Sequence, residues 1–264
     1  MKKFLTVALA GVLAASMLFT GCSKKAESKV TDKLIVGTNA EFPPFEYMND
    51  KKQPEGFDIA MIKEIGKRMG KKVEIKNMEF KSLIGAMESD SINAIIAGMT
   101  KTEKREKAVD FSDSYYTTNQ AIILKKDSKI TKLAQLDGKK IGVQEGTTGD
   151  LISSGDKFGD GKKAKVLVKG AKVKRFKKGV DAVMDLKNGS VDAVVIDELT
   201  ANEFVKKNAK KLKIVIDSAG SEYYCIALTK GNTAYKEEVN KQIKAIKEDG
   251  TYDKLKAKYI DSKN

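Results

Sequence analysis

The feature that most constrains the fold of this chain is the alternation of short apolar stretches with longer, amphipathic ones. The short stretches predict strands, some apolar enough to be covered on both faces, at 34–36, 73–75, 93–97, 120–124, 140–143, 166–168, 191–196, 214–216 and 224–228. In the amphipathic stretches, apolar residues recur every three or four positions, as Phe57, Met61, Ile65 and Met69 do. Alternating strands and helices predict an α/β fold with mainly parallel sheets.

The predicted strands and helices form two successive sets. The body of the chain runs from about residue 32 to residue 264, and the hydrophobic content of 41% suffices for a packed core. All three prolines lie between Pro43 and Pro54, so no proline-rich linker separates the two sets. This pattern fits two lobes that are joined by continuous strands.

The N-terminus has the features of a secretion signal, with Lys2 and Lys3 ahead of an apolar run at 4–19. A transmembrane anchor is the alternative, but the run is shorter than the roughly 20 residues that span a bilayer. Gly21-Cys22 resembles the lipobox of bacterial lipoproteins. That resemblance implies a signal peptide at 1–21 and a tether at 22–31 whose lipidated Cys22 holds the protein at the outer face of the cytoplasmic membrane.

The remaining cysteine, Cys225, has apolar neighbours, and a lone cysteine of this kind is usually a small buried side chain. Because Cys22 lies in a polar, tether-like tail, we expect no disulfide between the two.

Histidine is absent from the chain, and no CxxC spacing occurs. Ser-His and Cys-His nucleophile systems are therefore excluded, as is a cysteine-based zinc site. We expect no enzyme activity, no metal and no cofactor. The formal net charge of +14 would suit an anionic partner, but the chain is predicted to be exported. We therefore interpret basic clusters such as 172–178 as solvated faces and expect no nucleic acid.

Three pairs of motifs together resemble the bacterial solute-binding proteins of family 3, which bind amino acids. They are VGTNAEFPPFE with GFDI, AGMTKTEKR with DFSD, and GVQEGTT with VDAVVID, and they start at residues 36, 56, 97, 110, 142 and 191. Each motif alone is weak, but the ordered set spans nearly all of the body of the chain.

The resemblance implies a two-lobed periplasmic-binding-protein-like fold of type II, with two strands crossing between the lobes. Lobe 1 would comprise 32–117 and 222–264, and lobe 2 would comprise 118–221. The family function is to bind a free amino acid by hinge closure and to deliver it to the permease and ATPase subunits of an ABC importer. A monomer is expected.

A free amino acid is a zwitterion, so its receptor needs both positive and negative groups. Arg105 offers a planar fork that matches a carboxylate, and Thr147 and Thr148 open a helix whose N–H groups suit the same group. By resemblance, Arg105 binds the α-carboxylate, Asp197 binds the α-ammonium, and Gly98 and Thr100 add a carbonyl and a hydroxyl. The alternatives are a surface ion pair for Arg105 and helix caps for Thr147, Thr148 and Asp197.

The ligand side chain has its own candidate contacts. Phe42 and Phe80 are candidates to sandwich it, and Asn39 and Glu41 are candidates for specificity. Glu41 would favour arginine or lysine if it faces the ligand, and the alternative is a position facing water. Two further ligand-binding candidates are Met99 and Gln144. Arginine, lysine, glutamine and cystine stay open as ligands.

Two other functions stay open. One is an enzyme on the same scaffold, similar to the dehydratase relatives of the family, with Glu41 or Glu145 as its acid or base. The other is a signalling co-receptor for amino acids that acts through a partner.

Overall fold

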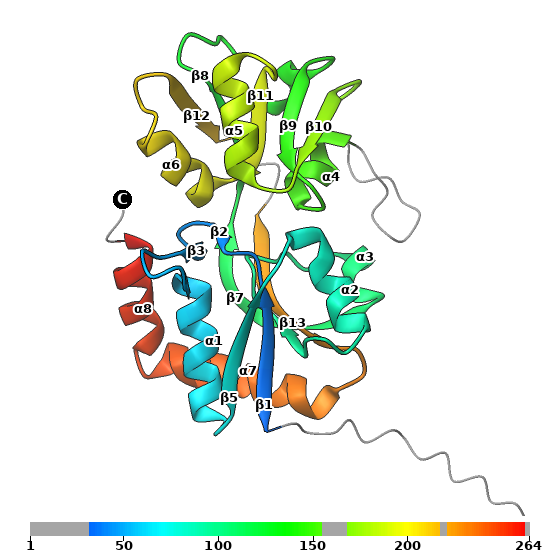
Figure 1. Ribbon diagram of the computed structural model, residues 1–264, viewed down its shortest axis with the longest axis vertical. Coiled ribbons are helices and arrows are strands. Elements are labelled where there is room, and N and C mark those ends of the chain that lie inside the picture. The colour runs from blue at the N-terminus through cyan, green and yellow to red at the C-terminus, as the bar shows by residue number, and fades with distance from the viewer. Residues whose placement is uncertain (1–31, 155–167, 217–220, 262–264) are drawn as a thin grey trace, which may run out of the picture. The chain divides into compact units, whose positions relative to one another are not determined.

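The computed structural model describes residues 32–154, 168–216 and 221–261 (Figure 1). The predicted signal peptide and tether, with Cys22, lie outside these residues. Among the helices described, none is both long enough and apolar enough to cross a membrane.

The first lobe is built on a five-stranded sheet in the order β5-β1-β6-β13-β7. Its strands are β1 (Lys33–Thr38), β5 (Lys72–Asn77), β6 (Ala94–Ile95), β7 (Val109–Thr118) and β13 (Glu222–Thr229). β1 runs parallel to β5 and β6, whereas β13 runs antiparallel to β6 and β7. The sheet is therefore mixed rather than purely parallel.

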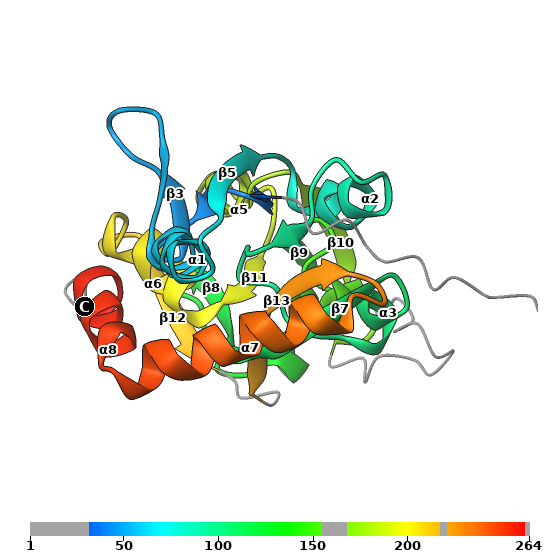
Figure 2. The same cartoon turned by 90° about the horizontal axis from the view of Figure 1, so that it is seen from below.

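Helices cover the sheet of the first lobe. They are α1 (Phe57–Arg68), η1 (Phe80–Ser82), α2 (Leu83–Glu88), α3 (Glu103–Glu106), α7 (Thr233–Glu248) and α8 (Thr251–Tyr259). Figure 2 shows α7 running across this lobe, with α8 continuing from its end. α7 contacts β7, and α8 contacts both α1 and α7, so the C-terminal segment returns to the lobe formed by the N-terminal strands.

The second lobe repeats this plan with the strand order β10-β9-β11-β8-β12. Its strands are β8 (Gln120–Lys125), β9 (Lys140–Gln144), β10 (Lys172–Phe176), β11 (Ala193–Asp197) and β12 (Leu212–Ile216). Its helices are η2 (Leu133–Leu136), α4 (Thr148–Ser154), α5 (Gly179–Asn188) and α6 (Glu198–Lys206). All five residues of β11 are buried, as expected for an apolar strand inside a covered sheet.

The first connection between the lobes is short and direct. β7 ends at Thr118 in one sheet and β8 begins at Gln120 in the other, so only Asn119 lies between them. The return connection runs from β12 to β13. This arrangement confirms the predicted α/β fold of two lobes. The exact lobe boundaries, after Thr117 and after Ser221, stay predictions.

One strand differs from its predicted place. The strand predicted at 166–168 is not where β10 forms, since Val168 lies in a bend and the two residues before it lie outside the described part of the chain. β10 instead occupies the basic run, where the partly buried Val173 and Phe176 lie among exposed basic side chains. The charges obscured the strand because it is an edge strand with much of its surface in water.

A small third sheet was not predicted. It consists of β2 (Glu41–Phe42), β3 (Glu46–Met48) and β4 (Pro54–Glu55), in that order. Strands of two or three residues are too short to show a period, but this sheet orients the residues that follow β1.

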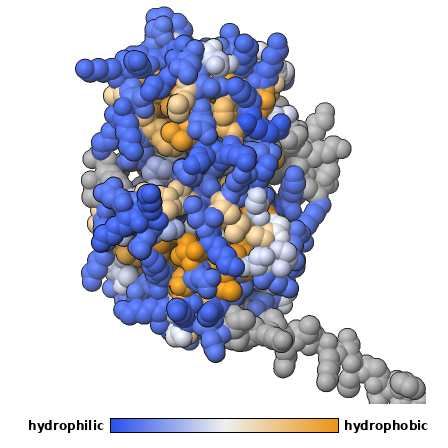
Figure 3. All heavy atoms as spheres, viewed as in Figure 1, coloured by the Kyte–Doolittle hydropathy of each residue, from blue (hydrophilic) through white to orange (hydrophobic). Residues whose placement is uncertain are grey.

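The face of the molecule in Figure 3 is mostly hydrophilic, with apolar side chains gathered in patches on both lobes. The basic run 172–178 is only partly the solvated face that we predicted. Lys177 Nζ lies 2.6 Å from Glu79 Oε1, and Lys178 Nζ lies 2.7 Å from Glu41 Oε1, both in the first lobe.

Candidate functional site

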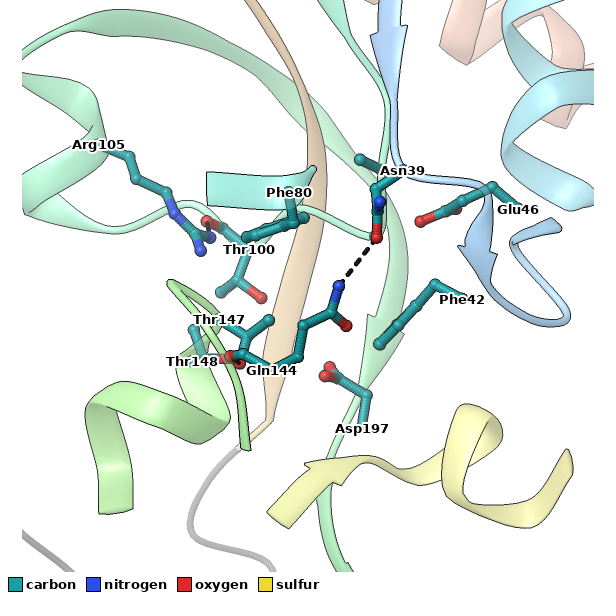
Figure 4. Close-up of a pocket in the computed structure, with 12 residues that line it drawn as sticks. Asn39, Phe42, Glu46, Phe80, Thr100, Arg105, Gln144, Thr147, Thr148 and Asp197 are labelled. Carbon is teal, nitrogen blue, oxygen red and sulfur yellow. Dashed lines mark hydrogen bonds between the residues drawn. The ribbon is translucent and has the colours of Figure 1, made fainter. Parts of the chain in front are cut away.

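A small pocket lies between the lobes. Its lining comes from both lobes and comprises Asn39, Phe42, Glu46, Phe80, Ala97, Gly98, Thr100, Arg105, Gln144, Thr147, Thr148 and Asp197. Figure 4 shows these side chains converging from strands, loops and helices that are far apart in the sequence.

Arg105 provides the positive charge of the pocket. The hydroxyl of Thr102 caps α3 by accepting a hydrogen bond from the Arg105 backbone N–H. The guanidinium donates to the carbonyl of Thr100 over 2.5 Å and to that of Gly146 over 3.0 Å, and it lies 5.2 Å from the centre of the Phe80 ring. Arg105 is therefore no surface ion pair, because it is buried and held in one orientation.

Burial lowers the pKa of Arg105 to about 10, and the charges of Glu222 and Asp197 oppose that shift. The guanidinium nevertheless stays protonated at neutral pH. A buried positive charge that points into a pocket is suited to an anionic group such as a carboxylate.

Asp197 provides a negative charge in the same pocket. It is the last residue of β11 and accepts a hydrogen bond of 2.7 Å from the hydroxyl of Tyr224. Burial, followed by the charge of Glu222, raises the pKa of Asp197 to about 7. A nearby cation would stabilise the ionised form, so this position favours an ammonium group.

Thr147 and Thr148 lie at the start of α4, as predicted. Thr147 Oγ1 accepts a hydrogen bond from the backbone N–H of Asp150 and donates to the carbonyl of Gln144. Thr147 is therefore a helix cap as well as a pocket residue. Thr148 Oγ1 accepts from Gln120 Nε2 and donates to Glu222, so its hydroxyl is already ordered.

Gly98 allows the backbone to pass close to two aromatic rings. Its φ is +51°, and a Cβ at this position would lie 3.3 Å from atoms of Phe42 and of Tyr224. Both the conformation and the close contacts explain glycine here.

Two predicted ligand contacts do not line the pocket. Met99 is buried in the core of the first lobe, where it belongs to the cluster that includes Leu83 and Ala227, and it does not line the pocket. Glu41 does not line the pocket either, since its carboxylate pairs with Lys178 at a partly exposed position. Specificity for a cationic side chain can therefore not rest on a direct contact to Glu41.

Glu46 is the residue that sequence reasoning missed. It lies on β3, is fully buried and lines the pocket, and its carboxyl group lies beside that of Asp58. Burial, and then the charge of Asp58, raise its pKa well above the ordinary value. Glu46 ends the motif VGTNAEFPPFE, but the alternation of a strand does not continue through the turn between Phe42 and Glu46, so its burial could not be read from the sequence.

Asp58 lies beside Glu46. Its carboxylate accepts hydrogen bonds from the hydroxyl of Tyr115 over 2.6 Å and from the N–H of Gly98 over 2.8 Å. Burial raises the pKa of Asp58 to about 6 even though these two bonds favour its ionised form. Two carboxyl groups thus lie together beneath the pocket, and only Glu46 lines it.

The lobes contact each other across the pocket. Gln144 donates to Asn39 Oδ1 over 2.8 Å, the bond drawn in Figure 4, and Arg105 donates to Gly146. At the rim, Lys81 pairs with Glu145 over 2.9 Å. Glu145 does not line the pocket, so neither carboxylate named as an enzymatic acid or base contacts it directly.

Two α/β lobes that enclose a pocket with opposite charges at its walls define the class of two-lobed solute-binding proteins. Residues 34–262 match the family of bacterial extracellular solute-binding proteins, family 3, and the chain belongs to this family. The predicted resemblance is confirmed.

Individual relatives agree with this assignment. The arginine-binding extracellular protein ArtP of Bacillus subtilis is 33% identical, with 98% of each chain covered. The structure of an ancestral arginine-binding protein bound to arginine is 43% identical with a TM-score of 0.79, covering 87% of this chain and 99% of the other. The arginine-, lysine-, histidine-binding protein ArtJ of Geobacillus stearothermophilus is 35% identical with a TM-score of 0.75, covering 86% and 95%.

Proposed function

We propose that this protein captures a free cationic amino acid, with arginine as the preferred ligand, and passes it to the permease and ATPase subunits of an ABC importer. The observation that carries the choice of ligand is the buried carboxyl group of Glu46. Family membership supports the transport role, and the names of ArtP and ArtJ support arginine.

The main chain of the ligand would lie between Arg105 and Asp197. Its α-carboxylate would bind the guanidinium, and its α-ammonium would bind Asp197 and the oxygen atoms of Gly98 and Thr100. These groups come from different lobes, so a bound zwitterion favours the closed arrangement. The aromatic rings of Phe42 and Phe80 line the same pocket and would flank the aliphatic part of the side chain.

Glu46 selects the end of the side chain. A buried carboxyl group beside a second carboxyl group is costly when it is ionised, and its pKa is accordingly raised in the free protein. A guanidinium offers both a positive charge and a planar pair of donors to a carboxylate. The neutral amide of a glutamine ligand carries no charge. It would therefore not stabilise the ionised form of the Glu46 carboxyl group.

At the other end of the chain, lipidated Cys22 would tether the protein to the outer face of the cytoplasmic membrane. The extracellular location is that of the family, whereas the lipid follows from the Gly21-Cys22 sequence alone. We further propose that the protein acts as a monomer. It would bind without turnover, since neither Glu41 nor Glu145, the two carboxylates that an enzyme on this scaffold was expected to use, lines the pocket.

The test is a calorimetric titration of the mature protein with the twenty amino acids and cystine, repeated with Glu46→Gln. We expect arginine to bind best and Glu46→Gln to weaken arginine at least tenfold while changing glutamine binding less than threefold. A wild-type protein that prefers glutamine or cystine, or equal losses for arginine and glutamine, would refute the choice of ligand. Loss of arginine uptake on gene deletion separates transport from signalling, and unchanged uptake contradicts the transport role.

A further inference from the structure

Glu222 lies at the first position of β13, where the chain has just returned to the first lobe. Its Oε2 atom accepts two hydrogen bonds of 2.7 Å, one from Thr100 Oγ1 and the other from Thr148 Oγ1. Thr100 belongs to the first lobe and Thr148 to the second. One carboxylate oxygen on a connection between the lobes therefore binds a hydroxyl from each of them.

These two bonds determine the direction in which each threonine hydroxyl group points its hydrogen atom. An ionised carboxylate only accepts hydrogen bonds, so each threonine must donate its single hydroxyl proton to Glu222. Thr148 Oγ1 also accepts from Gln120 Nε2 over 3.2 Å. What the two hydroxyls can still offer to the pocket that they line is therefore lone pairs and no hydrogen.

We propose that Glu222 is a positioning residue for the α-ammonium group of the ligand, which it assists by making acceptors of the Thr100 and Thr148 hydroxyls. An ammonium group has three donors and no acceptor. Asp197 and the two threonine oxygens line one pocket and offer acceptors to it. If the hydroxyls pointed their protons into the pocket instead, they would repel the ammonium.

The same bonds couple this subsite to the position of the lobes. Because the two threonines come from opposite lobes, both hydroxyls reach one Glu222 oxygen only when the lobes are together. The acceptor set for the ammonium is thus complete in the closed arrangement. The contact between the ligand's α-ammonium group and the two threonine oxygens therefore stabilises the closed arrangement. It depends on the main chain of the ligand and not on its side chain.

The inference rests on the proposed function only in that the ligand is an α-amino acid. The test compares L-arginine with 5-guanidinopentanoic acid, which lacks the α-ammonium, by calorimetry on wild type, Glu222→Ala and Glu222→Gln. In wild type we expect arginine to bind far more tightly than the desamino compound. In Glu222→Ala that preference should fall at least tenfold, because both hydroxyls become free to turn their protons into the pocket.

Glu222→Gln should reduce the preference by an intermediate factor, since its amide oxygen still accepts a proton while its amide nitrogen donates one. It is nearly isosteric, so it preserves the test if the alanine variant does not fold. Glu237→Ala, at an exposed position of α7, is the matched control and should leave the preference unchanged. Argininamide, which keeps the ammonium, should weaken in Glu222→Ala together with arginine.

An equal loss of affinity for arginine and the desamino compound would mean that Glu222 only supports the fold, and would overturn the inference. So would an unchanged preference in both variants. If wild type prefers another amino acid, the choice of arginine fails alone, and the same comparison is made with that amino acid and its desamino form. A wild-type protein that binds no amino acid would refute both proposals.

Discussion

Gln144 Nε2 donates a hydrogen bond of 2.8 Å to Asn39 Oδ1, and this bond joins the two lobes directly across the pocket. Asn39 is itself held by a bond from its Nδ2 to the carbonyl of Met78, so its acceptor oxygen is aimed at the other lobe. Both side chains are buried. The pair therefore belongs to the closed arrangement and would separate if the lobes moved apart.

The Gln144–Asn39 bond should contribute to affinity by the same amount whichever amino acid is bound. Gln144→Ala removes one buried hydrogen bond of the closed arrangement, which is worth about 1 kcal/mol. We expect arginine to bind roughly fivefold to tenfold more weakly, by calorimetry, as that energy implies. Gln53→Ala, on an exposed side chain, is the control and should bind as wild type does. Unchanged affinity in Gln144→Ala would show that the bond does not stabilise closure.

Arg105 should be required for every amino acid ligand, because the α-carboxylate is common to all of them. Truncation of a buried charged partner costs about 2–5 kcal/mol, so Arg105→Ala should weaken binding at least about thirtyfold. Ligand-induced thermal shifts would measure the loss. Arg68→Ala is the matched control, since Arg68 pairs with Glu64 and Asp249 and does not line the pocket. A normal shift in Arg105→Ala would contradict the site.

Glu41 should have a small effect that is the same for all ligands. Its ion pair with Lys178 is partly exposed at the rim, with 26% of the Glu41 side chain accessible, and such pairs are worth about 0–1 kcal/mol. Glu41→Gln should therefore weaken arginine and glutamine by the same factor of less than about five. A selective loss of arginine would restore the role that the sequence first indicated for Glu41.

Arginine binding should release protons and strengthen as pH rises. In the free protein the pKa of Glu46 is raised well above its ordinary value, and a bound guanidinium would lower it again. Because the bound state then holds fewer protons, affinity increases with pH until the solution passes the raised pKa. Calorimetry in buffers of different ionisation enthalpy counts the protons.

Glu46→Gln should remove the protons that the Glu46 carboxyl group releases when the guanidinium of arginine binds beside it. Proton release from Asp197, whose pKa is raised to about 7, should remain because every amino acid has an α-ammonium. Glutamine is the ligand control, and it should show only this second component. Equal proton release for arginine and glutamine in wild type would contradict a cation at Glu46.

Much of the site was visible in the sequence because its members follow recognisable local structure. Arg105 follows a helix cap, Thr147 and Thr148 open a helix after Gly146, and Asp197 ends an apolar strand. The ends of strands and the starts of helices are local features. Local features can be found from residue order alone, so these four residues were predicted and the structure brings them together in one pocket.

The other parts of the site could not be predicted from the sequence, because they depend on the direction in which individual side chains point. Glu41 and Glu46 lie in the same motif, but only the pairing of β2, β3 and β4 decides that Glu46 is buried in the pocket and Glu41 pairs at the rim. Met99 likewise packs into the core of the first lobe and does not line the pocket.

The sequence by itself determined the α/β class, the two lobes, the family and the charged residues that a zwitterion needs, because periodicity and motif order are properties of the chain. Tertiary structure alone decided the roles of Glu46 and Glu222. The importance of Glu46 comes from burial, and that of Glu222 comes from partners more than 70 positions away in the chain, as in the bond from Thr148. Such contacts arise only after two sheets have formed and the lobes have closed upon each other.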